Sequence, residues 1–342
     1  MRALVTGAAG FIGSTLVDRL LSEGHQVAGV DNLHSGDAAN LDLARGGEAA
    51  RSGRFTLVRI DIGNPDFVDV VAGFNPDVVF HLAAQVDLRR SVVDPFFDAR
   101  TNVLGTINVC EASRRAGVRR IVYASSAESW YGAPHHLQEE EEECSSPAPR
   151  SPYAAAKLAG EFYLGAYADM YGLTPISLAL ADVYGPRQDP RGRPGAIAFV
   201  GGALADGRPT EAGGDGTAVR DYVYVDDVVD AFVRAGQAPV SLTGSYVIAS
   251  GRSTTIAEVH RLLAFSPQIP DPSGFAEPFA DDPHLPYSDI GRARRDLGWV
   301  PVVDLVEGIR RTAQWLRALP EPVSPADPVV GCPVGEEARS AS

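Results

Sequence analysis

The chain of 342 residues is poor in cysteine and in basic residues, and it has no long apolar run. Its three cysteines, Cys110, Cys144 and Cys332, are too few and too far apart for a disulfide framework or a metal-ligand motif. Such sparse use of cysteine is typical of a reducing compartment, so we expect the protein in the cytoplasm. No apolar stretch reaches the roughly 20 residues of a membrane-spanning helix, and no membrane association is expected.

The charge balance excludes a further class of partner. Aspartate and glutamate number 44 against 30 lysines and arginines, which gives a formal net charge of −14. Because nucleic-acid-binding proteins neutralise phosphates with an excess of basic side chains, no nucleic-acid partner is expected. Five consecutive glutamates at residues 139–143 are typical of a solvated loop. Nothing beside them would orient their carboxylates around an ion, so no metal site is expected.

A glycine-rich turn near the N-terminus is the first positive signal. A short apolar strand at residues 2–6 is followed at once by GAAGFIG, residues 7–13, which opens a segment with apolar residues at helical spacing. Gly7 allows a tight turn, Gly10 lets the backbone approach a diphosphate, and Gly13 lets the helix pack closely on the strand. The helix N-terminus then offers free N–H groups to phosphate. This order of strand, turn and helix predicts dinucleotide binding.

Alternating strands and helices predict an α/β fold: a Rossmann-type, doubly wound parallel sheet with a smaller C-terminal substrate-binding lobe. A helix is expected at 102–116 and a surface excursion at 35–53. The predicted strands are 2–6, 26–30, 55–60, 77–80, 120–124, 175–181, 222–225 and 245–249. We predict an NAD-binding domain formed by residues 1–185 and 222–250. A substrate-binding lobe is expected at 186–221 and 251–320, and a disordered tail at 321–342.

Residues that follow the strands are candidate site residues, because ligands of such sheets bind beyond the carboxyl ends of the strands. Asp31 follows the second strand. A carboxylate there accepts hydrogen bonds from both hydroxyls of an adenosine ribose and repels a 2′-phosphate, which predicts NAD rather than NADP. The third, fourth and fifth strands are followed by Asp61-Ile62, Ala83-Ala84 and Ser125-Ser126.

The sequence SPYAAAK at residues 151–157 predicts the first turns of a helix that carries proton-transfer chemistry. Ser151 suits the N-cap and Pro152 the first helical position. Tyr153 and Lys157 are then four residues apart on one helix face. A nearby cation favours the phenolate and lowers the tyrosine pKa from about 10, so that the phenol can exchange a proton with a substrate hydroxyl. Taken alone, the spacing also fits an ordinary helix face, and the rest of the chain decides between the two.

Together these motifs resemble a known family. The chain is similar to the extended short-chain dehydrogenase/reductases, and among them to the NAD-dependent epimerase/dehydratases of nucleotide sugars, from residue 1 to about 320. Within this family it most resembles the UDP-galactose (UDP-glucose) 4-epimerase type. The matching segments are TGAAGFIG at 6–13, DNL at 31–33, DI at 61–62, HLAAQVDLRRS at 81–91, N at 102 with GT at 105–106, YASS at 123–126, SPYAAAK at 151–157, VYGPRQDP at 183–190 and RDYVYVDDVV at 220–229.

The resemblance implies a role for each matching residue. Tyr153 would be the general acid/base, and Lys157 would lower its pKa and bind the nicotinamide ribose. Ser126 would hold the sugar hydroxyl, with Ser125 as the adjacent alternative, and Asn102 would support the site. The other implied NAD-binding residues are Gly7, Gly10, Phe11, Ile12, Gly13, Asp31, Asn32, Leu33, Ser35, Gly36, Asp61, Ile62, Leu82, Ala83, Ala84 and Gln85. The other implied substrate-binding residues are Asp87, Arg89, Asp182, Arg187, Ala196, His284 and, for the substrate diphosphate, Arg220.

The reaction that the resemblance implies is a redox-neutral 4-epimerisation of a nucleotide sugar. Tyr153 would remove the proton of the C4 hydroxyl while the C4 hydride passes to NAD. The 4-keto sugar would turn over in the pocket, and the hydride would return to its other face. Because the cofactor is regenerated in each turnover, tightly held NAD is expected. The resemblance also implies a homodimer formed through helices near 102–116 and 153–170.

Three positions depart from the family pattern for holding a nucleotide. Asp182 stands where an asparagine usually follows the sixth strand, and because a carboxylate repels a diphosphate we expect it to contact a hydroxyl or an amine. The segment before Asp289 lacks the usual second arginine, a role that His284 can fill only in part. Gly213 stands where an aromatic residue often precedes Gly-Asp-Gly. Loss of one donor to a phosphate costs about 1.5–3 kcal/mol, so these changes require compensation or a different substrate.

Glu128 supports an alternative reaction. It lies two residues after Ser126, where related dehydratases and decarboxylases carry a glutamate, although alignment on Tyr131-Gly132 removes the match and leaves a loop carboxylate. The second hypothesis is therefore a dehydratase, decarboxylase or dehydrogenase of the same family that acts on an atypical, even non-nucleotide, substrate. The third is a non-catalytic NAD-binding protein. The complete set of Ser126, Tyr153 and Lys157 argues against it.

Overall fold

The computed structural model describes residues 1–131, 149–190, 195–205, 218–264 and 289–319. Several predictions therefore lie outside the described residues. They concern Cys144, Cys332, Gly213, His284, the glutamates at 139–143 and the tail at 321–342.

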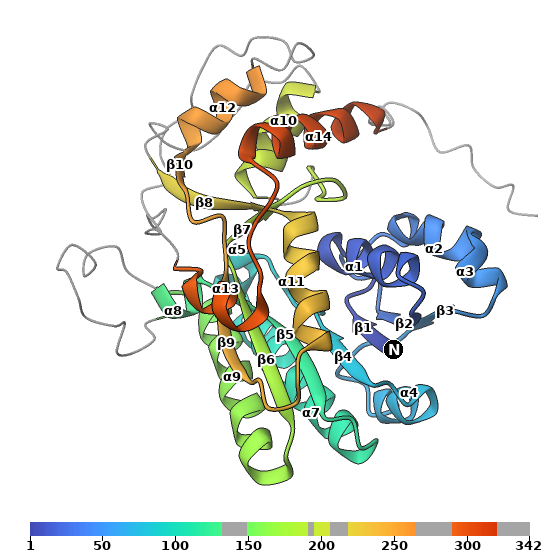
Figure 1. The fold of residues 1–342 in the computed structure, drawn as a ribbon. Coiled ribbons are helices and arrows are strands. Elements are labelled where there is room, and N and C mark those ends of the chain that lie inside the picture. The colour runs from blue at the N-terminus through green and yellow to red at the C-terminus, as the bar shows by residue number, and fades with distance from the viewer. Residues whose placement is uncertain (132–148, 191–194, 206–217, 265–288, 320–342) are drawn as a thin grey trace, which may run out of the picture.

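Parallel strands form a seven-stranded central sheet in the order β3-β2-β1-β4-β5-β6-β9 (Figure 1). The order reverses between β1 and β4, which is the switch point where ligands of doubly wound sheets bind. The predicted fold class, a Rossmann-type α/β fold, is thus confirmed. The strands are β1 (Arg2–Thr6), β2 (Gln26–Asp31), β3 (Phe55–Arg59), β4 (Val78–His81), β5 (Arg120–Ser126), β6 (Thr174–Leu180) and β9 (Gly244–Ile248).

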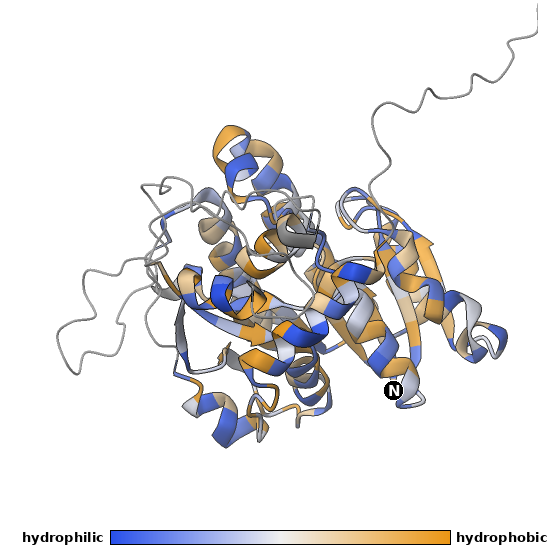
Figure 2. Cartoon of the chain, turned by 90° about the horizontal axis from the view of Figure 1, so that it is seen from above, coloured by the Kyte–Doolittle hydropathy of each residue, from blue (hydrophilic) through white to orange (hydrophobic). Residues whose placement is uncertain are grey.

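Helices cover both faces of this sheet, which explains why its strands are apolar on both sides. Along β1, Ala3 and Val5 belong to the hydrophobic cluster under α1 and α11, whereas Leu4 belongs to the cluster under α4, α7 and α9. In Figure 2 the strands are largely orange, whereas the helices carry both orange and blue residues. These helices are α1 (Phe11–Ser22), α11 (Val225–Gln237), α4 (Phe67–Phe74), α7 (Gly105–Arg115) and α9 (Pro152–Tyr171).

A second, three-stranded sheet lies above the first in Figure 1. Strand β8 (Val219–Tyr224) pairs in parallel with β7 (Asp182–Tyr184) and antiparallel with β10 (Ser253–Thr255). Helices α10 (Ala196–Ala205), α12 (Ile256–Ala264) and α14 (Leu305–Ala318) pack together beside it. These elements form a smaller lobe, and the predicted role of this lobe in substrate binding remains a prediction.

Strand pairing differs from the predicted division at the edges of the two units. Residues 182–184 and 222–224, which we assigned to the NAD-binding domain, pair in the second sheet, because the chain leaves the central sheet after Leu180. Helix α13 (Gly291–Leu297), which we assigned to the lobe, packs instead on β9 and α11. The rest of the division into domains remains a prediction.

Short helices occur in two places where the sequence analysis did not predict them. The excursion at 35–53 folds into η1 (Ala38–Leu41), α2 (Asp42–Gly46) and α3 (Glu48–Arg51). The helix expected at 102–116 is preceded by α5 (Leu88–Val93), α6 (Pro95–Ala99) and the π-helical turn η2 (Arg100–Leu104). The earlier start follows from the Asp94 side chain, which accepts a hydrogen bond from the N–H of Phe97 and caps α6. The short helix α8 (Glu128–Tyr131) follows β5.

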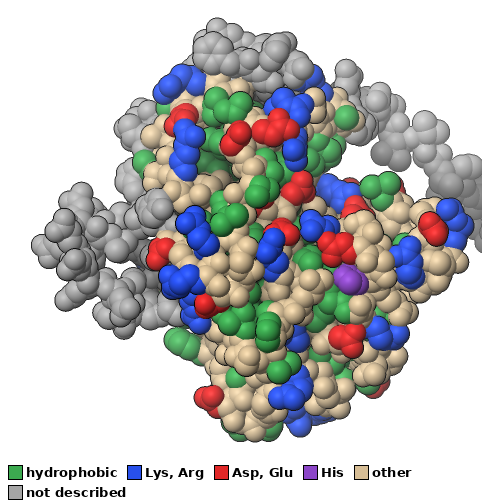
Figure 3. Space-filling view, viewed as in Figure 1, with side chains coloured by type: hydrophobic (Ala, Val, Ile, Leu, Met, Phe, Trp, Pro, Cys, Tyr) green, Lys and Arg blue, Asp and Glu red, His purple; other side chains and the backbone are tan. Residues whose placement is uncertain are grey.

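Surface charge and helix length bear on possible partners. On the face drawn in Figure 3, basic and acidic side chains are interspersed over the described part of the chain. Among the described helices none is both long and apolar enough to cross a membrane.

A buried aspartate on α11 anchors the segment that leads to α14. Asp227 is 3% exposed, and its two carboxylate oxygens accept hydrogen bonds from the N–H groups of Val302 and Val303, each at 3.0 Å. Its carbonyl accepts a hydrogen bond of 2.8 Å from Nε1 of the fully buried Trp299. These contacts fix the smaller lobe to a helix of the central sheet.

We therefore expect Asp227→Ala to lower the free energy of unfolding by about 2 kcal/mol, because two N–H groups lose a charged acceptor. Urea denaturation measures the change. The matched control is Asp226→Ala, which removes a half-exposed carboxylate 3.6 Å from Arg311 and should cost less than about 1 kcal/mol. Equal losses in the two variants would contradict the anchoring role.

Candidate active site

The helix that carries the predicted acid/base begins as its sequence predicts. Ser151 is the N-cap of α9, and its Oγ accepts a hydrogen bond of 3.0 Å from the N–H of Ala154. Pro152 occupies the first helical position, where its missing N–H leaves no donor unsatisfied. Tyr153 therefore lies in the first turn, at the end of α9 that faces the carboxyl ends of the strands.

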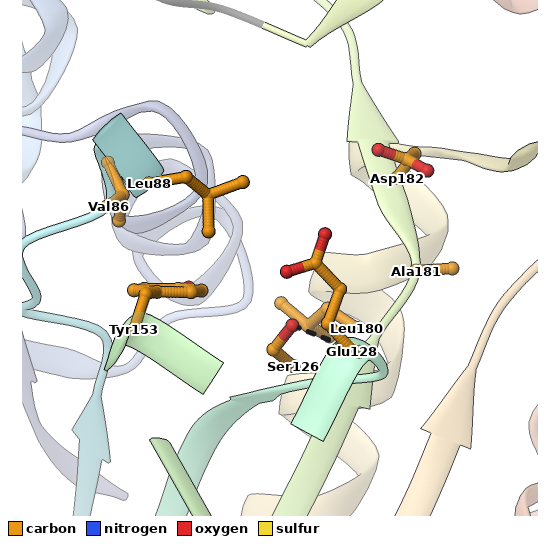
Figure 4. A pocket seen from close by; sticks show the side chains of 8 residues that line it. All are labelled: Val86, Leu88, Ser126, Glu128, Tyr153, Leu180, Ala181 and Asp182. Atoms are coloured by element: carbon orange, nitrogen blue, oxygen red, sulfur yellow. Dashed lines mark hydrogen bonds between the residues drawn. The ribbon is translucent and has the colours of Figure 1, made fainter. Parts of the chain in front are cut away.

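A pocket opens at this end of the central sheet (Figure 4). Tyr153 lies on one side of it, beside Val86 from the β4–α5 connection and Leu88 at the start of α5. Ser126 at the end of β5 and Glu128 at the start of α8 form the middle, and Asp182 lies beyond them at the start of β7. The residues that line the pocket are Val86, Leu88, Ser126, Glu128, Tyr153, Leu180, Ala181 and Asp182.

Lys157 lies behind Tyr153 and is buried, with 3% of its surface exposed. Its Nζ donates a hydrogen bond of 3.0 Å to the carbonyl of Ala124, and it lies 5.9 Å from the centre of the Tyr153 ring. Burial lowers the pKa of Lys157 to about 8, while Asp98 and Glu161 act in the opposite direction. The ammonium is thus close to the phenol but bound to the backbone of β5.

The expected lowering of the Tyr153 pKa is not found in this structure. Burial raises the pKa of the phenol above its usual value, and the carboxylates of Glu128 and Asp98 raise it further. The physical reason is that a phenolate would lose its hydration and face two negative charges. Tyr153 therefore holds its proton firmly at neutral pH.

The two adjacent serines at the end of β5 have different surroundings, as neighbours on a strand must. Ser126 lines the pocket, and its Oγ accepts a hydrogen bond of 3.3 Å from the N–H of Glu128. Ser125 instead donates a hydrogen bond to Glu161 on α9. Of the two serines that the sequence left open, the structure brings Ser126 to Tyr153.

Glu161 is a residue that sequence reasoning missed. It is 9% exposed and accepts hydrogen bonds from Ser125 on β5 and from Ser245 on β9. It lies four residues after Lys157, just as Lys157 lies four residues after Tyr153. Extending the register by one more turn would have found it.

Asn102 lies in the π-helical turn and is 2% exposed. Its Nδ2 donates to the carbonyl of Gln85 at 2.9 Å and to Asp98 at 3.0 Å, and its Oδ1 accepts from the N–H of Gln85 at 2.9 Å. Gln85 is bound in turn to Asp98. Asn102 therefore fixes the β4–α5 connection, which forms one wall of the pocket. Asn102 itself is not among the described residues that line the pocket. π-helical turns are frequent at functional sites.

The glycine turn brings backbone segments too close together for side chains. Gly7 has a φ of +69°, and a Cβ there would lie 2.8 Å from the nitrogen of Ala83. A Cβ at Gly13 would lie 2.0 Å from the carbonyl oxygen of Gly7. Gly10 is the N-cap of α1 and offers no side-chain acceptor to the first N–H groups of the helix. Those groups, from Phe11, Ile12 and Gly13, are left for an anion.

Asp31 lies beside this turn. It is 8% exposed, and its two oxygens accept hydrogen bonds from the N–H groups of Ala9 at 2.9 Å and Leu33 at 2.8 Å. Asn32 donates to Asp61 at 2.6 Å, which joins the ends of β2 and β3. The predicted residues at the ends of β1 to β4 thus gather along one edge of the sheet. The others at this edge are Ser35, Gly36, Ile62, Leu82 and Ala84.

The predicted substrate-binding residues are more dispersed. Arg220 on β8 lies 3.6 Å from Asp182, measured between Nε and Oδ2. Arg187 instead reaches Asp18 on α1, with its Nη2 donating at 2.6 Å. Asp87 caps α5 by accepting hydrogen bonds from the N–H groups of Arg89 and Arg90. Arg89 is exposed and Ala196 begins α10.

The pKa values of the two carboxyl groups in the pocket are raised above their usual values. Burial raises the pKa of Asp182 to about 6, although Arg220 acts in the opposite direction. Burial likewise raises the pKa of Glu128, and Arg220 again opposes it. The guanidinium of Arg220 therefore acts on two half-buried carboxyl groups.

Comparison with known proteins agrees with this arrangement. The model of the NAD dependent epimerase/dehydratase family matches residues 3–249. The chain belongs to this family. A UDP-glucose 4-epimerase of Mycolicibacterium smegmatis is 49% identical over 317 residues, which cover 93% of this chain and 99% of the relative.

Solved structures of epimerases match nearly the whole chain. The UDP-glucose 4-epimerase of Thermus thermophilus in complex with NAD is 37% identical, with a TM-score of 0.82, and the match covers 93% of this chain and 99% of that one. The UDP-glucuronic acid 4-epimerase of Bacillus cereus, in complex with UDP-glucuronic acid and NAD, is 28% identical with a TM-score of 0.81, at the same coverage.

The comparisons confirm the predicted family and the predicted NAD cofactor of this epimerase. They also confirm that the chain is an NAD-dependent enzyme of nucleotide-sugar epimerisation. The structure fits the cofactor, because Gly7 and Gly13 let the turn close tightly, and Gly10 at the N-cap of α1 places no side chain over the first N–H groups of the helix, which leaves a cradle of backbone donors. The roles of individual site residues remain predictions.

We expect Gly13→Ala to reduce the NAD that co-purifies with the epimerase by at least about tenfold, because the added methyl group forces the glycine turn open. Nucleotide released by denaturation and quantified by chromatography measures the loss. Gly73→Ala on α4 is the control, since a Cβ there meets nothing within 4 Å. Circular dichroism shows whether each variant folds. Undiminished NAD in folded Gly13→Ala would contradict the cradle.

Proposed function

We propose that this epimerase interconverts the C4 epimers of a UDP-hexose, as the name of its 49% identical relative indicates for that protein. The observation that carries the proposal is the meeting of Tyr153 and Ser126 in one pocket, with Lys157 behind them. Both side chains lie at the carboxyl edge of the sheet, on which the glycine turn also opens.

The residues of the pocket divide the proton chemistry between them. NAD, when bound, supplies the acceptor and donor of the C4 hydride. Tyr153 exchanges a proton with the C4 hydroxyl through its Oη, and Ser126 orients that hydroxyl by a hydrogen bond. Because burial raises the pKa of Tyr153, the phenolate that accepts this proton needs the nearby Lys157 cation to stabilise it, and it becomes the neutral phenol when it takes the proton. The same phenol is then ready to return a proton to the sugar.

A dehydratase or decarboxylase reaction is the second candidate, because Glu128 lines the same pocket. A protonated carboxyl group opposite Tyr153 would suit elimination from a 4-keto sugar, and burial favours that form. Mass-resolved chromatography of products from UDP-glucose separates the two reactions. Unchanged mass with a new retention time supports epimerisation, and loss of water supports the second candidate.

We expect Tyr153→Phe to lower the rate of UDP-glucose epimerisation by about 10³-fold, within the range for general acid/base groups, while NAD remains bound. Steady-state rates and the NAD content of the purified variant measure the two effects. Ser125→Ala is the comparison, because its hydroxyl contacts Glu161 rather than the pocket, and its loss of rate should be far smaller. A Tyr153→Phe enzyme with wild-type turnover would contradict the proposed acid/base.

We further propose that the epimerase is a cytoplasmic homodimer. Large apolar side chains on the outer sides of α6, η2 and α9 support the dimer: Phe96 is 83% exposed, Leu104 59% and Phe162 64%. Exposed apolar surface of this kind is typical of a protein interface. The free thiol of Cys110, buried in the core, supports a reducing compartment.

We expect Phe162→Asp to convert a dimer into monomers, because a carboxylate would be buried at the interface without a partner. Light scattering during size-exclusion chromatography measures the mass. Leu43→Asp, which changes a 72% exposed leucine on α2, is the control and should leave the mass unchanged. A dimer that survives Phe162→Asp would place the interface elsewhere.

A further inference from the structure

The active-site pocket is acidic on the side opposite Tyr153. Glu128 and Asp182 both line it, from α8 and β7, and Figure 4 shows the Glu128 carboxyl group between the Tyr153 side and Asp182. Within the described part of the chain, no lysine, arginine or histidine lines this pocket. The guanidinium of Arg220 lies 3.6 Å from Asp182.

The position of the reacting group limits which sugar substituents meet these carboxyl groups. If the C4 hydroxyl is bound by Tyr153 and Ser126, the groups on the neighbouring ring carbons, which include C6, are within a few ångströms of the remaining walls. A hydroxyl at C6 can donate a hydrogen bond to a carboxylate. A C6 carboxylate cannot donate, and it would bring a negative charge beside the carboxyl groups of Glu128 and Asp182 in a half-buried site.

We propose that Glu128 and Asp182 select for uncharged hexoses and exclude hexuronates, an inference that rests on the proposed 4-epimerase function. It assigns to Asp182 a role on the sugar, in place of the phosphate contact that an asparagine would make there. It also gives Glu128 a function in epimerisation itself. The two residues would act on substrate choice and not on proton transfer at C4.

The charge state of the pocket supports the proposal. Burial raises the pKa of Asp182 to about 6, which leaves this carboxyl group ionised at pH 7.5. The groups that face Asp182 are Arg220, Asp221 and Tyr222 on β8 and Glu128 on α8. Because Arg220 already pairs with Asp182, its charge is partly used before a second carboxylate arrives.

The test compares UDP-glucose with UDP-glucuronic acid as substrates at pH 7.5. We expect kcat/KM to favour UDP-glucose by about 100-fold in the wild type, as repulsion between partly buried like charges would give. Each of Glu128→Gln and Asp182→Asn should reduce this ratio by about tenfold, since each keeps the shape of the side chain and removes its capacity to carry a negative charge. The control is Asp69→Asn, an exposed residue on α4, which changes the net charge equally and should leave the ratio at its wild-type value.

The pH dependence of the ratio gives a second readout. As the pH falls from 7.5 to 5.5, Asp182 with a pKa of about 6 gains a proton, so the preference for UDP-glucose should weaken severalfold. The Asp182→Asn enzyme should show a flatter profile. Effects of Tyr153 and Lys157 on turnover cancel in the ratio, because both substrates use the same proton chemistry.

Binding measurements separate this inference from the proposed function. Dissociation constants of both nucleotide sugars, measured on Tyr153→Phe, should show the same preference without turnover. A protein that binds UDP-glucose preferentially and converts neither sugar would overturn the proposed function and support the selectivity. Equal binding and turnover of the two sugars by the wild type would overturn the selectivity alone. An unchanged ratio in the double variant Glu128→Gln/Asp182→Asn would also overturn it.

Discussion

Two buried charges of opposite sign on one face of α9 set the geometry of the whole site. Lys157 binds the carbonyl of Ala124, and Glu161 one turn later binds Ser125 and Ser245. Burying a charge costs free energy unless the charge is paired or hydrogen-bonded. A shift of α9 along the sheet would break these hydrogen bonds, so they fix the position of the helix against the sheet. That register places Tyr153, one turn before Lys157, at the mouth of the pocket beside the end of β5.

The two ends of the ligand path have opposite electrostatic character. The glycine turn and the N-terminus of α1 offer N–H groups without side-chain acceptors, which suits the phosphates of NAD. The pocket beyond them contains Glu128 and Asp182, whose pKa values are raised by burial. Arg220 acts on both of these carboxyl groups and opposes that rise. We propose that the first region attracts the phosphates of the cofactor and that the second repels negatively charged substituents of the sugar. We propose that the unusual Asp182 is part of the sugar site, where its charge is only partly offset by Arg220, the arginine that was expected to bind diphosphate.

Local sequence signals predicted the parts of the fold that depend on neighbouring residues. The glycine turn, the N-cap at Ser151 and the apolar strands each follow from a few adjacent positions, and the structure bears them out. The choice between Ser125 and Ser126 required the pairing of β5 with its neighbours. The departure of β7 into a second sheet likewise depends on β8, which follows some 35 residues later in the chain.

The pKa of Tyr153 could not be predicted from the spacing of Tyr153 and Lys157. Spacing places a cation near the phenol, but it says nothing of burial or of Asp98 and Glu128, which come from other elements and raise the pKa. Glu161 was missed for a related reason, since its partners lie on β5 and β9. Sequence therefore predicted the candidate reacting groups, whereas their electrostatics depended on the tertiary structure.

We propose that the hydride leaves C4 and returns to it within a single residence of the sugar in one pocket. The most direct test is to incubate the purified enzyme, without added cofactor, with UDP-glucose deuterated at C4 and to analyse the UDP-galactose formed. The account predicts that the product keeps the deuterium at C4 and that none passes to unlabelled sugar in a mixture. Loss of the label to solvent, or its transfer between molecules, would contradict it.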